Sequence, residues 1–348
     1  MRHGAAVEPE LVGPRALREW ITGEQKEHSR VFLVESGAPQ DRVDGVAGPH
    51  DVVLLPEGSA AYEGEAHAVR YSGGFREIGD ELFFGTRGIE LQDYIAASFV
   101  QIVGPTAVCL FDAAGRQAFL DDMELARRTG VFPSALLDPR VILADRSALE
   151  RPEELESPHA VRVSADGDVS IGVRGEAIGR VDDLPTLLSH PLPRAAVWRG
   201  RASENPVTAD ITRRDRIERY LGATDLMKML RVANGAAKIS GFGWSLLGDD
   251  LGDAEPAAAD PFLLETAEGL VLADTRTLRR QLLSPPTATV VAVVQTSGTP
   301  EAAAERVARR LGMRSSEADI LCHEAVTALN VRRGTRVDAS GPTEGNER

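Results

Sequence analysis

The last third of the chain contains short apolar runs separated by residues with strong turn and capping preferences. Two runs, 262–265 and 270–273, flank a turn at Glu268 and Gly269, and a third run covers 278–283. Apolar runs of this length between turn residues are typical of β-strands, and a short connection containing glycine favours a hairpin. We therefore expect three strands in succession.

Three helices are expected directly after these strands. Ser284 stands before two prolines and Thr299 stands before Pro300, so each serine or threonine supplies an N-cap ahead of a proline in the first turn. Gly298 and Gly312 follow the first two helical patterns, and we expect both glycines to end a helix in the left-handed conformation. The predicted order is β, β, β, α, α, α.

The third helix is expected to begin at a capping box formed by Ser316 and Asp319. Its apolar residues recur at helical spacing and form a core stripe: Ala318, Leu321, Cys322, Ala325 and Leu329. A second stripe beside it can face a groove: Ile320, His323, Glu324, Thr327 and Val331. The alternative is that this second stripe packs on the N-terminal region and covers an edge strand.

The N-terminal two thirds of the chain predict a mixed α/β structure. Strand-like runs and one longer apolar segment follow each other at 31–34, 51–55, 67–71, 82–84 and 91–103. A strand at 106–111, a helix at 116–128 and a strand at 141–144 have the order of a βαβ unit. Runs at 161–163 and 169–173 predict a hairpin around Gly167, and 213–232 predicts a helix.

These patterns place the chain in the α/β (α+β) class and divide it into five parts. The expected parts are an N-terminal α/β region (1–104), a second α/β region (105–247), a polar and acidic linker (248–260), the module of three strands and three helices (261–338), and a disordered tail (339–348).

The C-terminal module resembles a known peptide-binding domain. Its helical part reads TATVVAVVQTSGTPEAAAERVARRLG and then EADILCHEAVTALNVRRG. Over 261–333 the order, spacing and helix boundaries are similar to those of the RiPP recognition element, a PqqD-like winged helix-turn-helix domain that binds the leader of a ribosomally synthesised precursor peptide. The resemblance implies a C-terminal winged helix-turn-helix with this role.

In that family the leader adds as an antiparallel strand to the third strand and lies against the third helix. The leader-binding residues that the resemblance implies here are Leu278, Arg279, Arg280, Gln281, Leu282 and Leu283 on the strand, and Ile320, His323, Glu324, Thr327 and Val331 on the helix. Main-chain pairing would provide affinity, and alternate side chains would set the register.

The whole chain, with a large region ahead of the module, most resembles the stand-alone recognition proteins of daptide biosynthesis. In that pathway other enzymes convert a peptide C-terminus to an amine. The resemblance implies a precursor leader peptide as ligand, and an oxidative decarboxylase, an aminotransferase and a methyltransferase as partners. It implies no catalysis and no cofactor in this chain.

Composition and charge are typical of a cytoplasmic protein that binds neither membranes nor nucleic acid. The 348 residues carry a formal net charge of -14, which opposes nonspecific binding to nucleic acid. We identify no long apolar span and no signal peptide at the start. Cys109 and Cys322 both lie in apolar stretches, so we expect buried thiols rather than a disulfide framework.

Two other functions remain open at this point. An enzyme would use an N-terminal α/β cleft, with the C-terminal module selecting the substrate. However, Gly241, Gly243 and Gly248 do not have the spacing of a dinucleotide loop, and the seven histidines lack the spacing of a zinc site. A winged-helix transcription regulator is the third possibility, although the expected third helix carries acids and no Lys or Arg.

Overall fold

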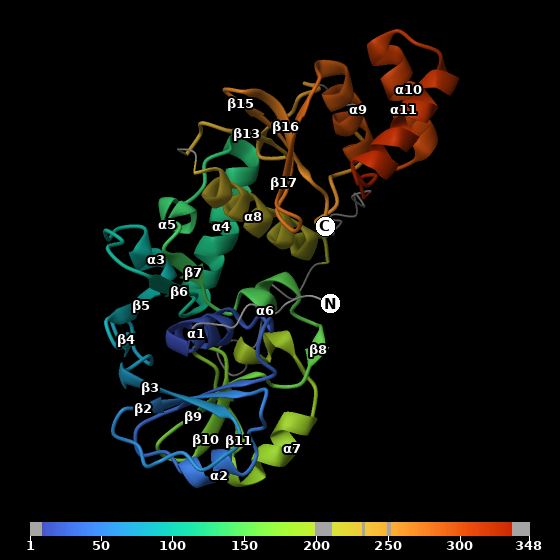
Figure 1. The fold of residues 1–348 in the computed structure, drawn as a ribbon. Helices are drawn as coiled ribbons and strands as arrows, with labels where there is room; N and C mark the ends of the chain where they lie inside the picture. The colour runs from blue at the N-terminus through green and yellow to red at the C-terminus, as the bar shows by residue number, and fades with distance from the viewer. Residues whose placement is uncertain (1–8, 199–210, 232–233, 249–251, 336–348) are drawn as a thin grey trace, which may run out of the picture. The chain divides into compact units, whose positions relative to one another are not determined.

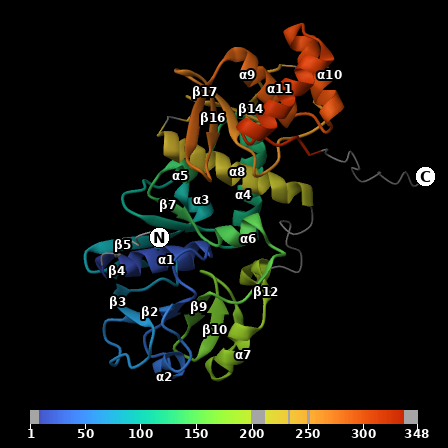
Figure 2. The same ribbon diagram turned by 45° about the vertical axis from the view of Figure 1, so that its right-hand side comes forward.

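A computed structural model describes residues 9–198, 211–231, 234–248 and 252–335, and its class is mixed α/β, as predicted. The chain forms two compact units (Figures 1 and 2). Unit 1 comprises residues 1–121 and 133–214, and unit 2 comprises 122–132 and 215–348. These units differ from the predicted parts, since 104 and 105 fall inside unit 1.

Unit 1 is built on a sheet of ten strands. In spatial order these are β11 (Ala177–Arg180), β10 (Asp168–Ile171), β9 (Ala160–Val163), β1 (Val31–Val34), β2 (Val52–Pro56), β3 (His67–Gly73), β4 (Glu81–Phe84), β5 (Arg87–Asp93), β6 (Thr106–Cys109) and β7 (Val141–Leu143). The neighbours from β9 to β3 pair in parallel, as do those from β5 to β7, whereas β4 and the β10–β11 hairpin are antiparallel.

The central strands are apolar because both faces of the sheet are covered. All four residues of β1 are buried, as expected for a parallel strand between two layers. Helix α1 (Val12–Thr22) covers one face, where the Trp20 indole N–H donates to the Val161 carbonyl at 3.1 Å. Helices α2 (Gln40–Asp44) and α7 (Leu184–Ser189) contribute to the core on the other face.

Two local predictions for the N-terminal two thirds of the chain are confirmed. Strand β6 precedes α4 (Ala113–Thr129) in the sequence and β7 follows it. The two strands pair in parallel, which makes the predicted βαβ unit. Strands β9 and β10 form the predicted hairpin, and Gly167 in its turn has a φ of 78°. Smaller elements fill the connections: α3 (Tyr94–Ala97), α5 (Ser134–Leu137), α6 (Arg146–Glu150), and the pair β8 (Leu155–Glu156) with β12 (Leu192–Pro193).

The described residues of unit 2 form a second sheet, the helices α8 to α11 and the C-terminal part of α4. The strand order is β14 (Gly243–Trp244), β13 (Lys238–Ser240), β15 (Phe262–Thr266), β16 (Gly269–Asp274), β17 (Arg279–Leu283). Helix α8 (Ile211–Leu230) lies on one face, where the Arg219 guanidinium stands 3.9 Å from the centre of the Phe262 ring. The other face packs on α9 (Pro285–Gln295), followed by α10 (Pro300–Leu311) and α11 (Ser315–Ala328).

Most of the predicted helix boundaries in unit 2 are present. The Ser284 hydroxyl accepts the Thr287 N–H at 3.3 Å, the Thr299 hydroxyl accepts the Ala302 N–H at 3.2 Å, and Gly312 ends α10 with a φ of 66°. Such N-caps each stabilise a helix by about 1 kcal/mol.

Two of the predicted boundaries are wrong. Helix α9 ends at Gln295 with Thr296 as its C-cap, and Gly298 does not have a positive φ. The Thr296 hydroxyl instead donates back to the Ala292 carbonyl at 2.8 Å. Helix α11 begins two residues early, because Arg314 rather than Ser316 is its N-cap. No side chain caps it, so the Ser316 and Asp319 capping box does not form.

The predicted linker is also different in the structure. Of residues 248–260, those described pack within unit 2: Glu255 pairs with Thr335 and forms an ion pair with Arg216 at 3.1 Å, and Asp260 is buried. The acidic residues that resemble a solvated linker in the sequence therefore have basic and backbone partners. Strand β13, which precedes this segment, joins the same sheet as β15. The predicted tail, 339–348, lies outside the described residues.

Cys109 and Cys322 are both buried and form no disulfide, as predicted. Within the described ranges, we find no helix with the combined length and apolar character that crossing a membrane requires.

Candidate functional site

Strand β17 lies at an edge of the unit 2 sheet. It pairs with β16 on one side and is the last strand in the order, so along its other side it has no strand partner among the described residues. Four successive residues, Arg279 to Leu282, are exposed, and only Leu283 is buried. An open edge presents unpaired N–H and C=O groups, which form a template for a further strand.

The register shows which side chains share each face of this edge. Leu283, Gln281 and Arg279 stand opposite Leu270, Leu272 and Asp274, on the face that packs on α9. Leu282 and Arg280 stand opposite Val271 and Ala273, on the face that α8 covers. Leu282 is 64% exposed beside the nearly buried Val271. An added strand would therefore contact the exposed apolar side chain of Leu282.

Leu278 is the one predicted strand residue that lies outside β17. It has a φ of 56° and is 71% exposed, so it belongs to the turn that leads from β16 into β17. A positive φ is uncommon for leucine. The strand therefore begins at Arg279, one residue later than predicted.

Four of the five residues in the predicted stripe on the third helix lie on an exposed face of α11. Ile320, His323, Glu324 and Thr327 are all exposed, and Ile320 is 58% exposed. By helical geometry they occupy the face opposite the buried residues Ala318, Cys322 and Ala325, rather than a face beside them.

The prediction that Val331 contacts a ligand is wrong. Val331 is 1% exposed and belongs to the unit 2 core, so it is not available to a ligand. The prediction extended the helical spacing to residue 331, but α11 ends at Ala328 and Asn330 has a φ of 55°. This turn redirects the chain and buries the valine.

The charges at the edge of β17 are unbalanced. Arg276, in the preceding turn, forms an ion pair with Glu218 at 2.8 Å. Arg279 and Arg280 are exposed and, within the described ranges, form no ion pair. The edge therefore combines an open backbone ladder, one exposed leucine and two arginines without acidic partners.

We compared the chain with protein families, with curated proteins and with solved structures. None of them matches it.

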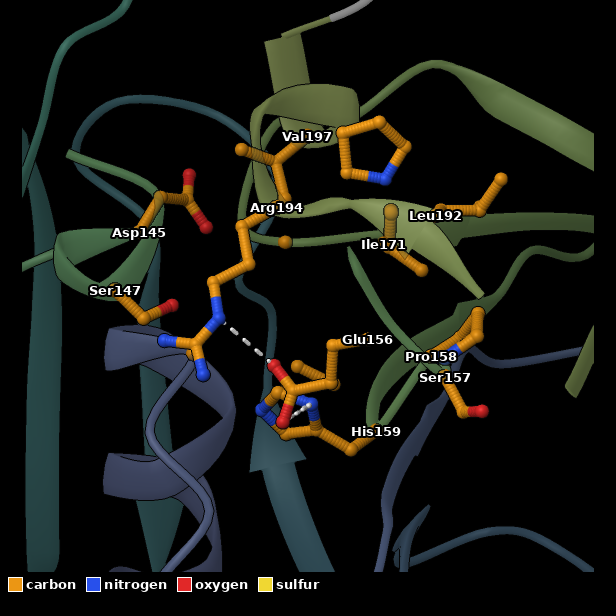
Figure 3. Close-up of a pocket in the computed structure, with 14 residues that line it drawn as sticks. Asp145, Ser147, Glu156, Ser157, Pro158, His159, Ile171, Leu192, Arg194 and Val197 are labelled. Carbon is orange, nitrogen blue, oxygen red and sulfur yellow. Dashed lines mark ion pairs between the residues drawn. The ribbon is translucent and has the colours of Figure 1, made fainter. Parts of the chain in front are cut away.

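Unit 1 contains a pocket that the sequence did not indicate (Figure 3). The Arg194 guanidinium lies 3.0 Å from Glu156, and His159 Nδ1 lies 3.6 Å from the same carboxylate. Ser147 and Asp145 line the pocket from α6 and from its N-terminal flank. Glu156 and Arg194 come from the strands β8 and β12 and their flanks, and no spacing in the sequence connects them.

This pocket has little capacity for a substrate. Its volume is about 40 Å³, room for a few water molecules. Glu156 is held by Arg194, and the separation from His159 exceeds a hydrogen bond. Across the described ranges, no three His, Cys, Asp or Glu side chains gather as metal ligands.

The ends of the parallel strands in unit 1 are occupied by an ion-pair cluster. Active sites of α/β proteins commonly lie beyond the carboxyl ends of the strands. Here Glu35 follows β1 and lies 3.7 Å from Arg162 and 3.6 Å from Arg76. Arg162 is buried, stands 5.1 Å from the centre of the Trp20 ring and donates to the Phe75 carbonyl at 2.6 Å. These arginines anchor the β3–β4 loop.

Proposed function

We propose that the chain is a recognition protein that binds an extended peptide by strand addition at β17. The ligand is the leader of a ribosomally synthesised precursor, and the site is a PqqD-like winged helix-turn-helix formed by β15–β17 and α9–α11. One observation carries the proposal: β17 combines an open edge with four successive exposed residues. Native proteins usually cover or shorten such an edge.

The arrangement of unit 2 supports this use of the edge. Strands β13 and β14 extend the sheet on the side away from β17, so the additional strands of this chain leave β17 open. Leu283 and the core residues of α11 belong to one hydrophobic cluster, which fixes the edge strand and the third helix on the same framework. A rigid framework lowers the entropy cost of binding an extended peptide.

Recognition of this kind needs no chemistry in the chain itself. Binding the leader raises the local concentration of the attached core for a modifying enzyme that docks nearby. By the daptide resemblance, the proposed partners are an oxidative decarboxylase, an aminotransferase and a methyltransferase acting in the cytoplasm.

A winged-helix regulator is disfavoured by the charge of α11. A recognition helix in DNA presents Arg, Lys, Asn or Gln to bases and phosphates. Helix α11 has no Lys or Arg, and Glu317, Asp319 and Glu324 are all exposed on it. Inserting three carboxylates between phosphates is electrostatically unfavourable.

Two titrations of the full chain test the proposed function against DNA binding. One uses the synthetic leader of a short precursor encoded beside this chain, and the other uses duplex DNA from the same neighbourhood, both at about physiological salt. We expect saturable binding of the leader and no sequence-specific binding of the duplex. Specific submicromolar DNA binding without leader binding would instead identify a regulator.

A further inference from the structure

The side chains along the edge of β17 restrict the sequence of the peptide strand that can bind there. Strand addition through backbone groups is tolerant of sequence, so specificity comes from cross-strand side-chain pairs. The exposed side chains of the edge are two arginines, one amide and one leucine in the order Arg279, Arg280, Gln281, Leu282. This inference rests on the proposed function and specifies its ligand.

Arg280 is the strongest charge determinant of the four residues. It stands opposite Ala273 in β16, so the neighbouring strand offers it no acidic partner. Arg279 stands opposite Asp274, and this carboxylate also accepts the Arg276 N–H and the Thr277 hydroxyl, both at 2.8 Å. On the neighbouring strand, a carboxylate therefore stands opposite Arg279 and none stands opposite Arg280.

Leu282 is the apolar determinant on the same face as Arg280. It is 64% exposed and stands opposite Val271, which is 9% exposed. An apolar side chain on the added strand would cover Leu282 and continue the contact that Val271 begins. Removing this apolar surface from water favours binding, against the cost of ordering the peptide.

We propose that the bound strand carries an apolar residue followed two positions later by an acidic residue, and that a second acid directly after it adds a weaker contribution. The order follows from antiparallel addition: the partners of Leu282, Gln281, Arg280 and Arg279 are successive residues of the peptide. The apolar residue and the first acid share one face, as Leu282 and Arg280 do. Although the chain is acidic overall, with a net charge of -14, its docking edge selects an acidic peptide.

A selection from random peptides tests this sequence preference directly. Peptides of about 12 residues, long enough for one strand with flanks, are displayed and selected on the immobilised full chain. The same selection is made on Arg280→Glu and on the control Arg87→Glu, which changes an exposed arginine in β5, a strand paired on both sides. The affinities of selected peptides are then measured by fluorescence anisotropy.

We expect the unmodified chain and Arg87→Glu to enrich the apolar–x–acid order. Arg280→Glu should bind these peptides about fivefold to tenfold more weakly, because an attractive cross-strand pair becomes repulsive. It should also select Lys or Arg at the acidic position, which excludes general misfolding as the cause. Arg279→Glu should show a smaller loss.

The outcomes separate this inference from the proposed function. Peptides that bind without the acid, that carry the reverse order, or that bind Arg280→Glu equally well would overturn the inference and leave strand addition intact. A chain that enriches no peptide and binds no leader would overturn the proposed function itself.

Discussion

Proline at position 282 or 281 should reduce leader binding at least tenfold. Neighbouring residues of a strand direct their backbone N–H groups to opposite sides. One of Gln281 and Leu282 therefore points to β16, and the other points to the open edge. Proline removes the N–H, and its ring blocks close approach of another strand. Both variants should lose binding, because the substitution also restricts the preceding residue.

The two proline variants provide controls for each other. The variant whose N–H points to β16 should also lose about 3 kcal/mol of stability, whereas the outward one should unfold close to the unmodified chain. Circular dichroism and thermal unfolding identify the outward variant, and calorimetry measures its leader affinity. Normal leader binding by that folded variant would show that β17 is not the docking edge.

Replacing Asp260 with asparagine should change how the stability of unit 2 depends on pH. Asp260 is 3% exposed, and its carboxylate accepts the Arg332 N–H at 2.7 Å. Burial raises the pKa of Asp260 to about 6, an effect that the Arg332 N–H and the charge of Arg219 only partly oppose. Arg219 on α8, Gln295 on α9 and Arg332 after α11 all face this carboxyl group.

The sign of the effect follows from proton binding. The ordinary pKa of 3.8 applies to the unfolded chain, so between pH 3.8 and about 6 the folded state holds a proton that the unfolded state lacks. The contribution of Asp260 to stability is therefore present at low pH and falls as the pH rises through this window. Because the asparagine side chain cannot ionise, the unfolding free energy of the variant does not fall in this way as the pH rises.

Chemical unfolding at about pH 4.5 and about pH 7 measures the effect. The difference in unfolding free energy, Asp260→Asn minus the unmodified chain, should increase by about 2 kcal/mol between these two pH values. Buried Arg219, whose pKa desolvation lowers to about 10, stays charged at both. A difference that stays constant or decreases with pH would show that Asp260 is ionised in the folded state throughout.

Local features of the sequence predicted unit 2 well. The caps at Ser284 and Thr299 and the left-handed Gly312 depend on residues within one turn, so their chemistry can be read from neighbours in sequence. The prediction was wrong where another part of the chain determines the outcome. Val331 is buried because a turn at Asn330 directs it into the core, and no residue pattern distinguishes that turn from one more helical turn.

The sheets show the same limit. Most strands of the unit 1 sheet coincide with predicted apolar runs, but β11 has no predicted run and β5 begins before the apolar segment 91–103. The pairing of β1 with β9, far apart along the chain, joins the two α/β regions that were predicted as separate parts. Likewise, the open edge of β17 depends on β13 and β14 joining the far side of the sheet. A residue such as Arg280 can be predicted on a strand. Its lack of an acidic partner becomes evident only from the register with β16.

Calorimetry with the two halves of the precursor tests the central claim most directly. The full chain is titrated with the isolated leader, with the leaderless core and with the intact precursor. If β17 accepts the leader as a strand, leader and intact precursor should bind with similar affinity and the core alone should not bind. Equal affinity for the leaderless core and the intact precursor would contradict leader recognition.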